Sequence, residues 1–84
     1  MALRTVAVIL QEPVALFEYG VLAEVFGIDR TDEGVPAFDY RVCSEEDRPL
    51  EARNGTTVGA PHRLDAAADA DLVAVPASPA AWDR

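Results

Sequence analysis

Three polar side chains near the amino terminus have the chemistry to bind a ligand or transfer a proton. Glu18 is a carboxylate between two aromatic residues, and Gln11 and Glu12 follow directly after an apolar run. A carboxylate in apolar surroundings acts as a ligand-facing or acid/base group at many functional sites. A first-turn glutamate also interacts favourably with the helix dipole, so a purely structural role for Glu18 is the alternative. Glu24 is about 240° further around a helix and does not share the face of Glu18.

Cys43 and His62 are the other residues that chemistry could use. We expect Cys43 to be a small residue at a strand end, because the single histidine belongs to a separate loop after a proline. His62 has no second histidine or cysteine pair at metal-ligand spacing, which predicts no metal site. The glycines form neither a phosphate-binding motif nor a nucleophile elbow. We therefore expect no cofactor and no complete catalytic constellation.

The elements that position Glu18 are a strand and a helix. Residues 5–10 are apolar without alternation, which predicts a strand buried on both faces, as in parallel sheets. Residues 14–26 are apolar nearly all round at helical spacing and predict a buried helix that stops at Gly27. Ligands of α/β sheets bind at the carboxyl ends of the strands. Glu18 is expected close to that edge, with Gln11 and Glu12.

The rest of the chain continues the α/β pattern. Residues 38–43 alternate and predict a strand nearer the sheet edge, and Asn54-Gly55 predicts a hairpin between residues 50–53 and 56–58. Residues 64–68 predict a short helix, and residues 72–75 a second central strand, after which Ala77 and Ser78 complete the expected pocket edge. The order is β-α-β-(hairpin)-α-β. This order predicts part of a doubly wound, flavodoxin-like parallel sheet that stops too early to be complete.

Composition restricts the function classes. The chain has 84 residues, half of them hydrophobic, and a net charge of −8. Such a charge repels phosphate backbones, so no direct nucleic-acid contact is expected. One cysteine forms no internal disulfide, and no run is long enough for a membrane span, which favours the cytoplasm. A small chain this rich in apolar residues predicts self-association or cover from the remainder of a longer polypeptide.

Several segments together resemble a known family. They are Val6-Ala7-Val8-Ile9-Leu10, Phe17-Glu18-Tyr19-Gly20-Val21-Leu22-Ala23-Glu24-Val25-Phe26-Gly27, Phe38-Asp39-Tyr40-Arg41-Val42-Cys43-Ser44 and Ala70-Asp71-Leu72-Val73-Ala74-Val75-Pro76. In this order they resemble the ThiJ/PfpI branch of the class I glutamine amidotransferase-like superfamily. The helix segment is close to the FELGxxxEVFG pattern of AraC/XylS-type transcriptional regulators of the GlxA kind.

The resemblance implies that residues 1–84 are the amino-terminal portion of a ThiJ/PfpI-like α/β domain. It implies ligand sensing with a small-molecule effector or dimerisation, no enzymatic activity, and DNA binding in a region outside these residues. The alternative is a fragment of a ThiJ/PfpI hydrolase, hydratase or amidotransferase-like enzyme, in which Glu18 matches the glutamate beside a cysteine nucleophile. The chain departs from the family pattern at Ala77, where relatives carry glycine after Val-Pro.

Overall fold

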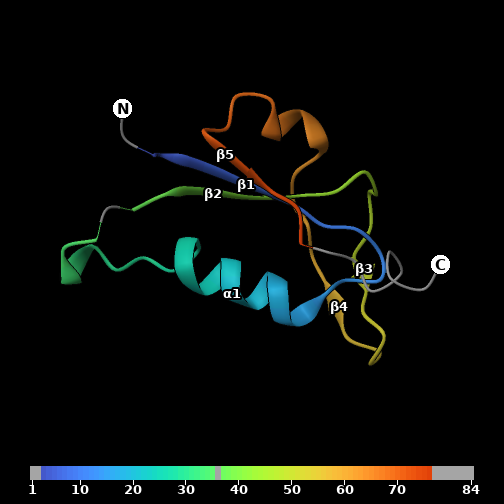
Figure 1. Ribbon diagram of the computed structural model, residues 1–84. Helices are drawn as coiled ribbons and strands as arrows, with labels where there is room; N and C mark the ends of the chain where they lie inside the picture. Colours follow the sequence, from blue (N-terminus) through green and yellow to red (C-terminus); the bar gives the residue numbers. More distant parts are fainter. Residues whose placement is uncertain (1–2, 36, 77–84) are drawn as a thin grey trace.

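A three-stranded parallel sheet forms the centre of the computed structural model, which describes residues 3–35 and 37–76. Its strands are β1 (Thr5–Ile9), β2 (Asp39–Cys43) and β5 (Leu72–Ala74), in the order β2-β1-β5 (Figure 1). Val8 pairs with Val42 on one side and with Ala74 on the other. The prediction that the two apolar runs are parallel neighbours is confirmed, and the fold is α/β.

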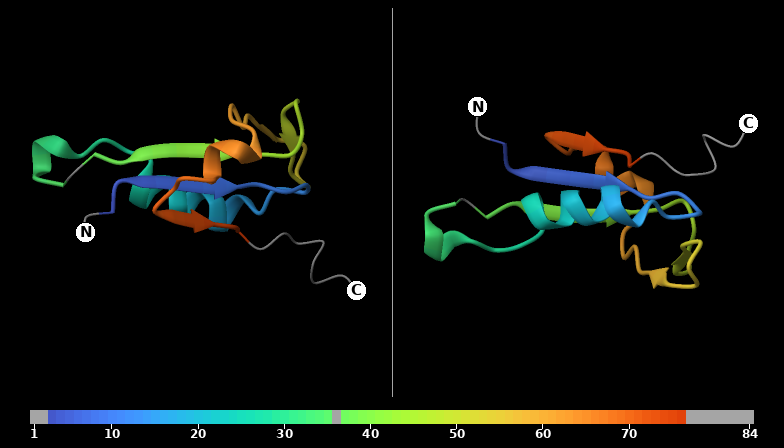
Figure 2. Two further views of the ribbon diagram at one scale, coloured as in Figure 1. Left: turned by 90° about the horizontal axis from the view of Figure 1, so that it is seen from above. Right: turned by 60° about the horizontal axis from the view of Figure 1, so that its bottom comes forward.

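One helix covers one face of the sheet. Helix α1 (Leu16–Phe26) follows β1, while the short 3-10 helix η2 (Leu64–Ala67) lies on the opposite face (Figures 1 and 2). A second short 3-10 helix, η1 (Thr31–Glu33), lies in the connection between α1 and β2. The segment predicted as a helix at residues 64–68 forms the 3-10 helix η2 instead of an α-helix. It is too short for an α-helix, and its turns close with i→i−3 hydrogen bonds.

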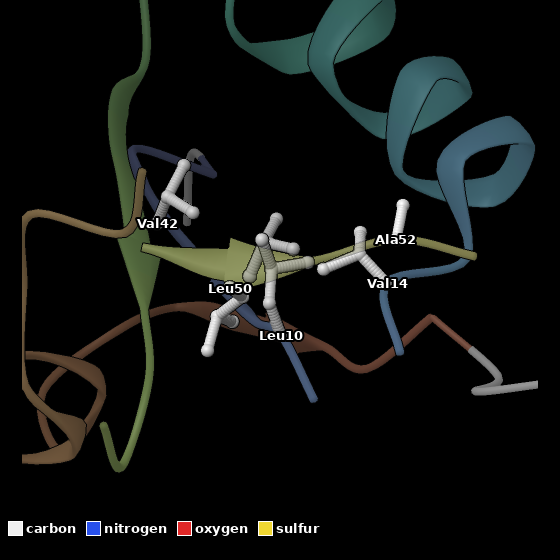
Figure 3. Packing of buried hydrophobic residues seen from close by; sticks show 6 residues of the cluster. Leu10, Val14, Val42, Leu50 and Ala52 are labelled. Atoms are coloured by element: carbon white, nitrogen blue, oxygen red, sulfur yellow. The ribbon is translucent and has the colours of Figure 1, made fainter. Parts of the chain in front are cut away.

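The hydrophobic core lies between α1 and the sheet and extends under the hairpin (Figure 3). Val8 of β1 pairs with Val42 of β2, and paired residues of neighbouring strands point to the same face of a sheet. The buried members of the cluster are Val8, Leu10, Val14, Val42, Leu50 and Ala52. Burial of residues 6–8 at 0% exposure confirms that β1 is covered on both faces.

The prediction of a buried helix is wrong for α1. No residue of α1 is buried, and Phe17 and Val25 are 79% and 52% exposed. The error arises because the sheet-facing side of the helix is covered, whereas no described segment packs on its outer side. Missing cover also makes β5 an edge strand and not the predicted second central strand. Among the described strands it pairs with β1 alone, and Val73 is 45% exposed.

The predicted hairpin is confirmed, with shorter strands. β3 (Leu50–Glu51) and β4 (Thr57–Val58) pair antiparallel as a separate two-stranded sheet. Gly55 has a φ of 87°, a conformation that glycine adopts without steric cost. The Thr56 amide donates to the side-chain oxygen of Asn54 at 3.1 Å, which closes the turn.

Polar contacts hold η2 against the sheet and align the first residues of β1 and β5. Arg41 of β2 donates to the carbonyl of Ala66 in η2 at 2.8 Å and pairs with Asp69 at 2.9 Å and Asp39 at 2.7 Å. The Asp71 carboxylate accepts from the amides of Arg4 and Thr5, which aligns β5 with the start of β1. No helix in the described ranges is both long and apolar enough to cross a membrane.

Gly27 is the C-cap residue of α1 and lies against the Tyr40 side chain of β2. A Cβ atom at Gly27 would lie 2.8 Å from the Ala23 carbonyl oxygen and 3.0 Å from the Tyr40 ring. We expect Gly27→Ala to lower the free energy of unfolding by about 1–3 kcal/mol through overpacking. Gly20→Ala is the matched control, because nothing lies within 4 Å and the change should add about 1 kcal/mol of helix stability. Urea unfolding measures both variants, and a Gly27→Ala protein as stable as wild type would contradict the expectation.

Candidate functional site

An open hollow lies between α1 and the carboxyl end of β5. Its volume is about 490 Å³, and its walls are almost entirely apolar. The lining residues are Phe17, Glu18, Val21, Leu22, Ala74, Val75 and Pro76. The hollow lies where the last residue of β5 and the two residues after it, Val75 and Pro76, run opposite the first two turns of α1. This location, at the carboxyl end of a parallel strand, is where α/β sheets bind ligands.

Glu18 provides the one charge among the described residues that line the hollow. It is exposed in the first turn of α1 and enters no ion pair within the described part of the chain. Its carboxylate is therefore available to a ligand in the hollow. The structure thus places Glu18 beside the end of β5, and its role in binding stays a prediction.

Glu12, also predicted at the pocket edge, joins the β1–α1 loop to the hairpin. Both carboxylate oxygens accept from the Arg48 guanidinium at 2.7 Å, and one also accepts from the Glu51 amide at 2.8 Å. The hydrogen bonds from Arg48, followed by the one from Glu51, lower the pKa of Glu12 to about 2. Glu12 does not line the hollow of Glu18 but a separate recess of about 400 Å³ beside Pro13 and Ala52.

The other predicted edge residues are Gln11, Ala77 and Ser78. Gln11 is exposed just after β1 and is not one of the residues lining the hollow beside Glu18. Ala77 and Ser78 lie outside the described residues. Their predicted roles in ligand binding stay predictions, and among the predicted residues that the structure describes, Glu18 is the one that lines the hollow.

Cys43 and His62 are neighbours, which the sequence interpretation missed. They form a parallel bridge: the His62 amide donates to the Val42 carbonyl at 3.1 Å, and the Ser44 amide donates to the His62 carbonyl at 3.0 Å. The segment around His62 carries no strand pattern that would have revealed this pairing. Cys43 is fully buried, and burial raises the pKa of its thiol, which disfavours the nucleophilic thiolate. It also points to the η2 side of the sheet, opposite Glu18, because Val42 faces α1.

Tyr40 is a second feature that sequence patterns did not single out. Its hydroxyl is buried and has no hydrogen-bond partner in the part of the chain that the structure describes. Burial, and next the neighbouring Tyr19, raise the pKa of Tyr40 to about 12, so the phenol stays protonated at physiological pH. No set of three or more His, Cys, Asp or Glu side chains within residues 3–35 and 37–76 could hold a metal ion.

Comparison with known proteins identifies no relative. No protein-family model matches the chain, and no curated protein and no solved structure matches it.

The Glu12–Arg48 pair makes stability depend on pH. Because the pKa of Glu12 is about 2 in the folded protein and ordinarily 4.5, its contribution is complete above about pH 4.5 and is lost as pH falls toward 2. We expect Glu12→Gln to be less stable than wild type near neutral pH and to lose less stability across this acidic window. Urea unfolding followed by circular dichroism at a series of pH values measures this.

Glu33→Gln is the matched control, since Glu33 is exposed in η1 and the same chemical change there leaves the hairpin contact intact. Its stability should follow the wild-type pH curve. If Glu12→Gln also followed that curve, the pair would not hold the loop to the hairpin.

Proposed function

We propose that this chain is the amino-terminal part of a ThiJ/PfpI-like domain that senses a small molecule and self-associates in a transcriptional regulator of the AraC/XylS type. The order β2-β1-β5, with α1 between β1 and β2, supports a flavodoxin-like doubly wound sheet, because such sheets begin with this arrangement. The helix that carries the family-like motif is α1, which bears Glu18.

The observation that carries the proposal is the hollow at the carboxyl end of β5. It combines an apolar lining with one carboxylate, and small-molecule sites typically combine an apolar surface with few polar groups. The acidic net charge of −8 disfavours DNA contact by these residues, so the proposal assigns DNA binding to another part of the regulator. The cytoplasm is the compartment in which such a regulator acts.

Self-association is supported by the outer side of α1. Four apolar side chains, at intervals of three or four residues, are each about half exposed or more: Phe17, Val21, Val25 and Ile28. We call these four residues the α1 stripe. Monomeric proteins rarely expose contiguous apolar surfaces, and such surfaces mark interaction sites.

A ThiJ/PfpI-like enzyme is the second candidate, because Glu18 lies next to the strand after which relatives carry their nucleophile. The reaction of such enzymes needs a cysteine nucleophile beside Glu18. The single cysteine of the chain, Cys43, is buried on the opposite side of the sheet. Cys43 therefore does not supply that nucleophile, and the enzymatic candidate requires a cysteine outside these residues. We propose the sensing role first because the hollow has an apolar lining with a single carboxylate, as small-molecule sites typically do.

A charge within the α1 stripe tests self-association. We expect the wild-type protein to sediment as a concentration-dependent oligomer and Val25→Asp to sediment as a monomer, because an aspartate in a contact surface loses its hydration. Val25 is 52% exposed, so the variant should keep the thermal unfolding midpoint of wild type within a few degrees.

Val35→Asp is the matched control, because Val35 is 39% exposed in the loop after η1 and lies outside the stripe. Its sedimentation should equal that of wild type. A wild-type protein that remains monomeric up to high concentration would contradict self-association through α1.

A further inference from the structure

The chemistry of the hollow beside Glu18 restricts its ligand. Six of the seven lining residues are apolar, so the lining side chains offer no hydrogen-bond donor. A ligand with several polar groups would lose hydration there without gaining partners. The ligand that fits has an apolar body and one polar group directed at Glu18.

The charge of that polar group follows from Glu18. Its carboxylate accepts hydrogen bonds but donates none, and no cation of the described residues pairs with it. An anionic ligand would be repelled, whereas a cation would gain an ion pair. Phe17, a residue that is 79% exposed at the same place, adds an aromatic face that attracts cations.

We propose that this hollow binds small organic ammonium ions. The ammonium group donates to the Glu18 carboxylate, and the apolar body packs against Val21 and Val75. A bare metal ion does not fit, since hard cations require several oxygen ligands and the lining side chains offer one carboxylate. This inference rests on the proposed function, because it names the ligand class of the sensing site.

Three probes of similar size test the proposal: 2-phenylethylammonium, 2-phenylethanol and phenylacetate. They share one apolar body and carry a positive, a neutral and a negative group. Each is titrated into the purified, isotope-labelled protein while amide chemical shifts are recorded by NMR. We expect 2-phenylethylammonium to bind most tightly, with shifts at Glu18, Val21 and Val75, and added salt to weaken its binding alone.

Glu18→Gln keeps the size of the side chain and removes its charge. We expect it to weaken 2-phenylethylammonium binding by up to about fivefold, the value of an exposed ion pair, and to leave 2-phenylethanol binding unchanged. Glu24→Gln is the matched control on the same helix, because Glu24 does not line the hollow and its loss should preserve the order of the probes. Both side chains are exposed, so both variants should fold like wild type, which their thermal unfolding verifies.

The outcomes separate this inference from the proposed function. Equal or tighter binding of 2-phenylethanol or phenylacetate at the hollow would overturn the ammonium assignment and leave a ligand-sensing role in place. The same holds if Glu18→Gln bound 2-phenylethylammonium as tightly as wild type does. No shift at the hollow with any of the three probes would overturn both the ammonium assignment and the sensing role.

Discussion

The parallel pairing of β1 with strands on both of its sides is the constraint on which the rest of the structure depends. β1 is the one described strand that pairs twice, and its central residues are fully buried. Its pairing brings residues 39–43 and 72–74 together from distant parts of the chain. The Asp71 carboxylate and the exchange of hydrogen bonds at Thr5 set the register with β5. Without that register, the end of β5 would not lie opposite the start of α1, and the hollow would not form.

Two glutamates near the same edge of the sheet have different environments. Glu12 is held by a guanidinium and a backbone amide, which satisfy its oxygens and lower its pKa. Glu18 lies beside apolar side chains with no such partners among the described residues. The first carboxylate ties the β1–α1 loop to the hairpin, and the second faces open space. Residue type alone does not distinguish these two situations.

The protein combines a strongly acidic net charge with exposed apolar surface. The chain has a net charge of −8, yet the outer side of α1 and the outer edge of β5 present exposed valines. Among the described residues that line the hollow between α1 and β5, Glu18 is the one that carries a charge. The α1 stripe and the hollow share Phe17 and Val21, so the proposed ligand binding and the proposed self-association involve one region.

The sequence by itself determined the elements that depend on local pattern. The unbroken apolar run of β1, the helical spacing ending at Gly27 and the Asn54-Gly55 turn each specify a backbone conformation through neighbouring residues, and all three predictions are confirmed. Parallel pairing of the apolar runs also followed, because strands buried on both faces occur in parallel sheets.

The features that depend on long-range contacts were decided by the tertiary structure alone. Three such features depend on which segments pack together: the covered side of α1, the edge position of β5 and the bridge between Cys43 and His62. Local periodicity does not indicate which segments these are. The same is true of Glu12, whose partner Arg48 lies 36 residues away. A pattern of three or four residues reports the conformation of a segment, whereas the environment of a side chain is set by atoms that are distant in sequence.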